Sequence, residues 1–405
     1  MSAPIATPAW GDGGSVVQAR QPAFWLLVAL IAAGAVRIGI LVAQAFALHP
    51  AAAFLAGALL TLYAIPFLLF VNRLDLFERE PATMVAAAFA WGGLVATSAA
   101  LPGNEAVVGL ATKLVSADFA VRWGPALAGP TTEELLKVLG VVVLALVARD
   151  EFDSPLDGMV YGALVGLGFQ VVESFVACIN AVTVAGGHDQ VVPVLQVFLV
   201  RALVGLWSHA AYTAISGYGV GYAVCRRDRT WTERIGVAAL CFGLAYLAHF
   251  LWNAPPLTDA FGEGFGLVVA VLAKGIPVLL LLVVMYRMAR HEEATWFRRA
   301  VAGEVGTDVL LADELEELMT LARRRDVIRM VRSIRGRRAA RLVEELQQAQ
   351  LALGVACSRG PAAGADEAEA ARRRIRALRV ELAHAGVERA GTLPHGAEGG
   401  SGAVR

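Results

Sequence analysis

The sequence predicts an all-α protein, a polytopic integral membrane helix bundle with about eight transmembrane spans and a small C-terminal helical cytoplasmic tail. Three observations lead to this fold class. Hydrophobic residues make up 57% of the 405 residues and charged residues only 17%, which is more apolar surface than one water-soluble core can bury. The apolar residues gather in runs that a bilayer can hold. After about residue 290 the composition changes to alternating Glu, Arg, Leu and Ala.

Eight apolar runs are the expected spans, because each comes close to the roughly 20 residues that a helix needs to cross a hydrocarbon core. They lie near residues 22–46, 51–71, 84–101, 131–148, 158–182, 202–225, 235–254 and 264–288. The first run is longer than the apolar core of a signal peptide and shows no small-residue cleavage site, so we expect it to remain as a span. Arg37 interrupts this run for no reason that the sequence explains.

The positions of arginine predict the orientation of the chain, since short cytoplasmic loops retain Lys and Arg. Basic residues follow the sixth and eighth runs, at Arg226, Arg227, Arg229, Arg234, Arg287, Arg290, Arg298 and Arg299. The segments near 47–50, 183–200 and 255–263 contain no Lys or Arg. We therefore expect a multi-pass protein of a bacterial cytoplasmic (inner) membrane with both termini in the cytoplasm. The connection 102–130 would then lie on the outer side.

Composition divides the chain into four segments. Residues 1–20 and 391–405 are rich in small residues and are expected to be disordered. Residues 21–290 form the transmembrane domain, and residues 291–390 form the helical tail. The Glu/Arg alternation of the tail is more typical of a solvated helix face or a short coiled pair than of a specific regulatory surface.

The charge balance and the cysteines exclude several classes of function. The formal net charge is +0, so no global field attracts nucleic acid, and we expect no nucleic-acid partner. The four cysteines have neither CxxC nor paired spacing. This pattern predicts neither disulfides nor a cysteine-based zinc cluster.

The fourth run begins with polar residues, and a charged side chain inside a span costs about 2.5–3.5 kcal/mol even on the mild insertion scale. The Pro-Thr-Thr sequence at 130–132 predicts a helix start, which would place Glu133 and Glu134 in a first turn facing the positive end of the helix dipole. Lys137 is spaced to pair with either carboxylate. A helix cap with one ion pair leaves the second carboxylate unexplained, which favours a functional role.

Three further runs carry strongly polar residues. Glu173 is embedded in the apolar fifth run, and His209 lies in the sixth, with Thr213 one turn later. His249 and Asn253 are four residues apart in the seventh run and therefore share a helix face. A single intramembrane histidine is often a packing residue. Two histidines together with three carboxylates favour a site.

These residues are expected at a similar depth in the bilayer. At a rise of about 1.5 Å per residue, Glu173 lies about 24 Å above the cytoplasmic start of its span and His249 about 21 Å above the start of its own. Spans four and six run in the opposite direction, which places Glu133 and His209 in the same outer half. We therefore expect carboxylates and imidazoles to meet in a cavity near the outer leaflet.

Such a cluster suits hydrolysis. A buried carboxylate can act as general base toward a water molecule, and His and Asn side chains can donate hydrogen bonds to the oxyanion that forms. No membrane-embedded GxSxG or HExxH motif is present, which disfavours serine-type and helix-borne zinc-type hydrolysis. No cofactor is required, although a zinc site assembled across helices is left open, with Glu133, Glu173, His209 and His249 as acceptable ligands.

The motifs resemble those of the PrsW family. EELLK at 133–137, FQVVE at 169–173, the isolated His209 and HFLWN at 249–253 occur in the order expected of that family, over about 120 residues. The family is related to the type II CAAX prenyl proteases and bacteriocin-processing enzymes, which are intramembrane proteases of the glutamate type. The wider group has His at the end of the second motif, where this chain has Glu173, and Arg at the end of the first, where it has Lys137.

The resemblance implies roles for the site. Glu133 would activate the water, Glu134 would assist or orient it, and His249 with Asn253 would stabilise the oxyanion. Glu173 and His209 complete the expected catalytic set. Lys137, Phe169 and Thr213 are expected to support it.

The resemblance also implies a substrate, because PrsW-like proteins are associated with the first, extracytoplasmic cut of membrane-anchored anti-sigma factors. The expected activity is therefore an intramembrane endopeptidase that acts on a membrane-anchored protein in the lipid bilayer. Two other functions remain open. One is a proton-coupled transporter with a Glu/His relay, although no internal repeat supports it. The other is a non-catalytic membrane scaffold whose tail recruits a cytoplasmic partner.

Overall fold

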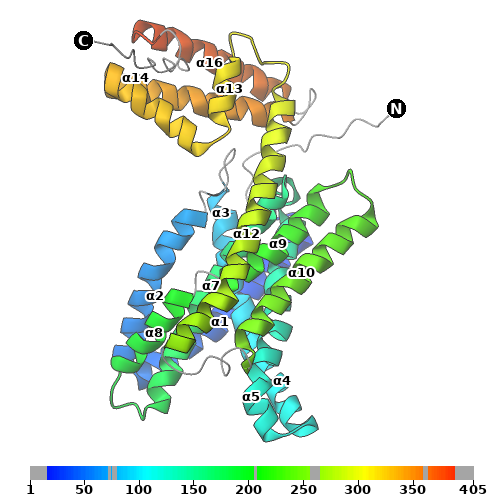
Figure 1. Ribbon diagram of the computed structural model, residues 1–405, viewed down its shortest axis with the longest axis vertical. Coiled ribbons are helices and arrows are strands. Elements are labelled where there is room, and N and C mark those ends of the chain that lie inside the picture. The colour runs from blue at the N-terminus through cyan, green and yellow to red at the C-terminus, as the bar shows by residue number, and fades with distance from the viewer. Residues whose placement is uncertain are drawn as a thin grey trace, which may run out of the picture. The chain divides into compact units, whose positions relative to one another are not determined.

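The computed structural model describes residues 16–71, 74, 80–204, 208–255, 265–358 and 364–387. Apart from residues 16–20, the predicted disordered ends lie outside these ranges. The helices fall into two compact units, one ending at Glu292 and the other beginning at Glu293. We call them the membrane unit and the tail unit; Figure 1 shows the helices of both.

Six helices in the described part of the chain are long and apolar enough to cross a membrane, which confirms the all-α polytopic class. They are α1 (Pro22–Leu48), α2 (Pro50–Val71), the continuous run of α3 (Ala82–Ala90), η1 (Trp91–Ala96) and α4 (Thr97–Leu114), α7 (Pro155–Val184), α10 (Trp231–Asn253), and the Val271–Ala300 part of α12 (Phe265–Ala300). The other two expected spans, 131–148 and 202–225, correspond to shorter helices, so the number eight stays a prediction. Arg37 is exposed on α1.

The segment 102–130, which was expected as a connection between spans on the outer side, is helical. The helix α4 continues to Leu114, and α5 (Ala117–Gly129) packs against it. Ser116 caps α5 by accepting a hydrogen bond from the backbone N–H of Phe119. Pro102 and Pro125 lie inside these two helices.

The predicted helix start at 130–132 was wrong. The helix α5 runs directly into η2 (Pro130–Glu134), a π-helical turn, and then into α6 (Leu135–Val147). Proline inside a helix lacks the N–H that the regular hydrogen-bond pattern needs, and a widened turn can accommodate it. Glu133 and Glu134 therefore lie in the middle of a helical run and not in its first turn.

A helix also occupies the expected outer connection 183–200. The helix α8 (Val192–Val204) packs against α2 and α7 through Val194, Val197 and Phe198. It precedes α9 (His209–Cys225), and it places Arg201 beside the helices that carry the candidate site. Packing of its apolar face explains why this segment is helical and not a loop.

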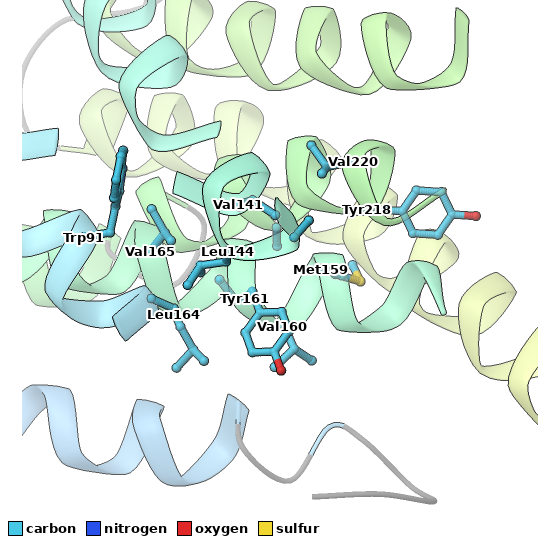
Figure 2. Packing of buried hydrophobic residues seen from close by; sticks show 14 of the residues in the cluster. Trp91, Val141, Leu144, Met159, Val160, Tyr161, Leu164, Val165, Tyr218 and Val220 are labelled. Carbon is cyan, nitrogen blue, oxygen red and sulfur yellow. The ribbon is translucent and has the colours of Figure 1, made fainter. Parts of the chain in front are cut away.

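The helix α7 is the centre of the membrane unit and runs antiparallel to α9. A Cβ atom at Gly162 would lie 2.2 Å from the carbonyl oxygen of Thr213, and one at Gly166 would lie 2.2 Å from that of His209. Only glycine permits this approach. Figure 2 shows the adjoining core, in which side chains of α7 such as Leu164 lie near Leu144 of α6.

The tail unit has its own core. Its helices are α13 (Ala312–Leu318), α14 (Leu321–Ser358) and α16 (Ala365–His384). The helices α14 and α16 pack against each other around buried residues that include Val343, Leu346, Ile375 and Leu378. The predicted helical character of the tail agrees with this arrangement.

Candidate active site

Glu133 lies at the centre of the candidate site, in the η2 turn. Its Oε1 atom accepts a hydrogen bond of 2.9 Å from Asn104 Nδ2, and Thr132 donates to Asn104 Oδ1. These contacts orient the carboxylate from α4. Its other oxygen, Oε2, is buried and has no hydrogen-bond partner among the described residues. A buried polar atom without a partner is destabilising, and this one is available to a ligand or reactant because Glu133 lines a cavity.

Two histidines from different helices face this free oxygen. His209, at the start of α9, places Nδ1 at 3.7 Å from Glu133 Oε2, and His249 of α10 places Nε2 at 4.0 Å from it. The two imidazole rings are 5.2 Å apart and nearly perpendicular. Glu133 thus faces a space that is bordered by two imidazole nitrogens.

A second carboxylate holds the other nitrogen of each histidine. Glu134 Oε1 lies 2.7 Å from His249 Nδ1, and Glu173 Oε2 lies 3.0 Å from His209 Nε2. Carboxylates in this position fix the orientation and tautomer of an imidazole. The structure therefore brings together the five ionisable side chains of the expected catalytic set.

Lys137 is fully buried beneath this arrangement. Its Nζ atom lies 2.5 Å from Glu134 Oε1, 3.0 Å from His209 Nδ1 and 4.7 Å from the centre of the Phe169 ring. Of the two expected pairings the structure shows the one with Glu134. Removing one partner of a buried ion pair typically costs about 3–5 kcal/mol, so Lys137 also holds the site together.

A cavity of about 520 Å³ opens beside Glu133. Asn253 lines it and donates a 3.1 Å hydrogen bond to the carbonyl oxygen of Pro125. Thr213 does not line it, and its buried hydroxyl has no hydrogen-bond partner among the described residues. The polar lining residues are Asn104, Glu133, Gln170, Glu173, Arg201, Ser208, His209, Tyr212, His249 and Asn253.

Sequence reasoning assigned no role to five of these polar lining residues, namely Asn104, Gln170, Arg201, Ser208 and Tyr212. Asn104 lay in a segment expected to be a connection, and Arg201 lay at the boundary of an expected span. Arg201 forms an ion pair with Glu173 and donates a 2.8 Å hydrogen bond to Ser174 Oγ. The available signal was an arginine within the apolar segment VPVLQVFLVRALV, which is as exceptional in a membrane protein as the carboxylates that were selected.

The donor set at the centre of the site fits a divalent metal such as zinc. One atom each from Glu133, His209 and His249 lies within 4.8 Å of the other two, and Glu173 contacts His209 from outside this group. Three protein ligands with an open position are typical of catalytic zinc, and the free Glu133 oxygen fits a ligand atom. Lys137 contacts His209 Nδ1, the nitrogen that faces Glu133 and would bind the metal. The contact with Lys137 and metal binding therefore compete.

A comparison with models of protein families finds a match that covers these residues. A family model described as PrsW family intramembrane metalloprotease matches residues 80–288, just over half of the chain. The chain belongs to the PrsW family. The PrsW match includes all the residues of the candidate site and ends before the tail unit begins.

Individual PrsW proteins are also similar to this chain. Protease PrsW of Geobacillus kaustophilus is 31% identical over 149 residues, which are 37% of this chain and 58% of that protein. Protease PrsW of Oceanobacillus iheyensis is 28% identical over 156 residues, 38% of this chain and 61% of that protein. The chain therefore spans about three fifths of the length of these curated relatives. No solved structure matches the chain.

Proposed function

We propose that this PrsW-family protein is an intramembrane endopeptidase in which Glu133 activates the attacking water. The observation that carries the proposal is the free Oε2 oxygen of Glu133, which is buried beside a cavity and faces two imidazoles. A carboxylate oxygen without another partner can accept a proton from water in that cavity. Asn104 orients this carboxylate by donating a hydrogen bond to its other oxygen, Oε1.

The chemistry follows from the positions of the side chains. As water attacks the peptide carbonyl, Glu133 takes one of its protons and later transfers it to the nitrogen of the leaving amine. His249 and Asn253, both lining the cavity, would donate hydrogen bonds to the oxyanion. This role for His249 requires the doubly protonated ring, because Nδ1 already faces Glu134 and Nε2 must also donate.

Glu134 and Glu173 would act as positioning residues. Glu134 neutralises Lys137 and orients His249, while Glu173 orients His209. If zinc is held by Glu133, His209 and His249, it would supply a Lewis acid at the reacting carbonyl. Glu133 would then be a ligand and no longer the free base, so metal dependence separates the two forms of the proposal.

The proposed substrate is a membrane-anchored protein that is cut near the outer leaflet of the bacterial inner membrane. An anti-sigma factor is the specific candidate, and its support is the motif resemblance together with the PrsW-family match. The cavity volume of about 520 Å³ can hold a short stretch of extended peptide.

The decisive experiment compares the N-termini of membrane proteins by mass spectrometry in cells that express the wild type, Glu133→Gln or Glu105→Gln at equal, folded levels. Glu105 is an exposed carboxylate next to Asn104 and is the matched control. Removal of a general base lowers the rate by about 10²–10⁴-fold. We expect new N-termini of a single-pass protein with the wild type and the control, and their loss with Glu133→Gln.

Other outcomes would contradict the proposal. Equal fragments from wild type and Glu133→Gln would remove Glu133 from the chemistry. No fragments under several envelope stresses, together with Glu133-dependent proton flux in proteoliposomes, would favour the transporter.

Metal dependence needs its own measurement on purified protein. We expect activity to persist after treatment with a strong chelator and removal of bound metal, with metal content checked by mass spectrometry. Stoichiometric zinc that is lost in His249→Ala, together with inactivation by the chelator and recovery with zinc, would instead support the metal form.

A further inference from the structure

Part of the tail unit carries positive charge that its own fold leaves unneutralised. Residues 321–341, the first part of α14, contain nine arginines and one aspartate and no other charged residue. Two of these arginines form ion pairs within the unit, and a third is buried. Six are exposed and form no ion pair with a described residue, namely Arg325, Arg332, Arg335, Arg337, Arg338 and Arg341.

Four of these arginines gather where α14 bends. Gly336 has φ 84° and ψ −178°, a conformation essentially restricted to glycine, and it separates two helical segments. Arg332, Arg335, Arg337 and Arg338 flank it in sequence, with Ile334 among them at 66% exposure. We call these five side chains, Arg332, Ile334, Arg335, Arg337 and Arg338, the arginine corner.

We propose that the arginine corner binds the anionic phospholipid headgroups of the membrane in which the protein resides. Guanidinium groups form paired hydrogen bonds with phosphate, and clusters of basic residues close to a membrane bind anionic lipid. An exposed isoleucine surrounded by arginines is the arrangement of a segment that lies at a lipid interface, with apolar and basic contacts together. Nothing in this proposal depends on the catalytic activity.

Lipid is favoured over nucleic acid because of how the tail unit is attached. The same helix, α12, includes the apolar segment that begins at Val271 and continues into the tail unit, so the tail unit is covalently tethered to a candidate membrane span. A covalent attachment of this kind raises the effective concentration of lipid without any new contact. Nucleic-acid recognition would also leave Ile334 without a role.

The test uses the full chain in nanodiscs of neutral phosphatidylcholine, mixed with sedimenting vesicles that contain or lack phosphatidylglycerol. We expect co-sedimentation with the anionic vesicles at low salt and its loss at about 1 M salt, where charges are screened within about 3 Å. Each arginine that reaches the surface strengthens partitioning by about fivefold. Replacing Arg332, Arg335, Arg337 and Arg338 by glutamine should therefore weaken it by at least about 20-fold.

A matched variant removes the same charge from another part of the tail unit. Arg323, Arg373, Arg374 and Arg376 form ion pairs with carboxylates, so their replacement by glutamine should leave vesicle binding within about twofold of wild type. In addition, Ile334→Ser should weaken binding with all arginines intact.

Four results would overturn the proposal. Equal loss in both quadruple variants would show a general charge effect. Salt-independent binding, or equal binding to neutral vesicles, would exclude headgroup recognition. Tighter binding of a short RNA or DNA duplex than of anionic vesicles at the same salt, lost in the arginine-corner variant, would assign the surface to nucleic acid.

Discussion

Glu173 shows how single residues in this site depend on neighbours from other helices. It forms an ion pair with Arg201 of α8 and contacts His209 Nε2 of α9 at 3.0 Å. Arg201 is held in turn by its hydrogen bond to Ser174. Such a series of side-chain contacts orients an imidazole only while the carboxylate keeps its charge and its position. Arg201 is therefore a positioning residue that acts through Glu173.

Substitution of Arg201 tests this positioning role. We expect Arg201→Ala to lower kcat by about 10–100-fold, the usual effect of losing an outer-shell partner, with a smaller change in KM. Arg201→Lys keeps the charge and should recover part of the activity. The measurement is steady-state cleavage of the identified substrate by folded, reconstituted protein. Equal kcat in Arg201→Ala and wild type would contradict the positioning role.

The helical elements bring the site together through two local departures from regular packing. The π-turn η2 places Glu133 and Glu134 in the middle of a helical run, and widened turns of this kind occur frequently at functional sites. The glycine face of α7 lets α9 approach closely enough for His209 to reach Glu173. Both features set the distances between side chains that come from different helices.

An added methyl group on the glycine face should disturb this spacing. Gly166→Ala would place a Cβ 2.2 Å from the carbonyl oxygen of His209, whereas a Cβ at Gly243 on α10 would meet no atom of a described residue within 4 Å. Overpacking costs about 1–3 kcal/mol, so we expect a lower unfolding temperature and at least about tenfold lower activity for Gly166→Ala. Gly243→Ala is the control and should match wild type in thermal unfolding and in cleavage. Wild-type behaviour of Gly166→Ala would show that α9 can move without affecting the site.

At the scale of the whole molecule, the arrangement of basic loops predicts its orientation. The connection between α9 and α10 carries Arg226, Arg227 and Arg229, whereas the connection between α7 and α8 carries no Lys or Arg. Each connection follows the C-terminal end of its helix, α7 or α9. Because α7 and α9 are antiparallel, the two connections lie at opposite ends of this helix pair. The proposed outer-leaflet position of the site depends on this orientation, because His209 lies at the opposite end of α9 from the arginines.

Cysteine labelling in intact cells tests the orientation. We expect His188→Cys to react with a membrane-impermeant maleimide from outside and Arg227→Cys to react only after permeabilisation. Both positions are exposed, and the unmodified protein is the control for the four native cysteines. The reverse pattern would place the site near the inner leaflet and would rule out an extracytoplasmic cut.

The sequence by itself determined the fold class and the membrane environment, and it selected five of the ionisable side chains that lie together in the candidate site. It could do so because an apolar run of span length and a charge inside it are local features with large free energies in lipid. The helical hairpin of α4 and α5, the π-turn at Glu133 and the contributions of Asn104 and Arg201 were decided only by the tertiary structure. These depend on packing between helices distant in sequence, which no local pattern of residues records.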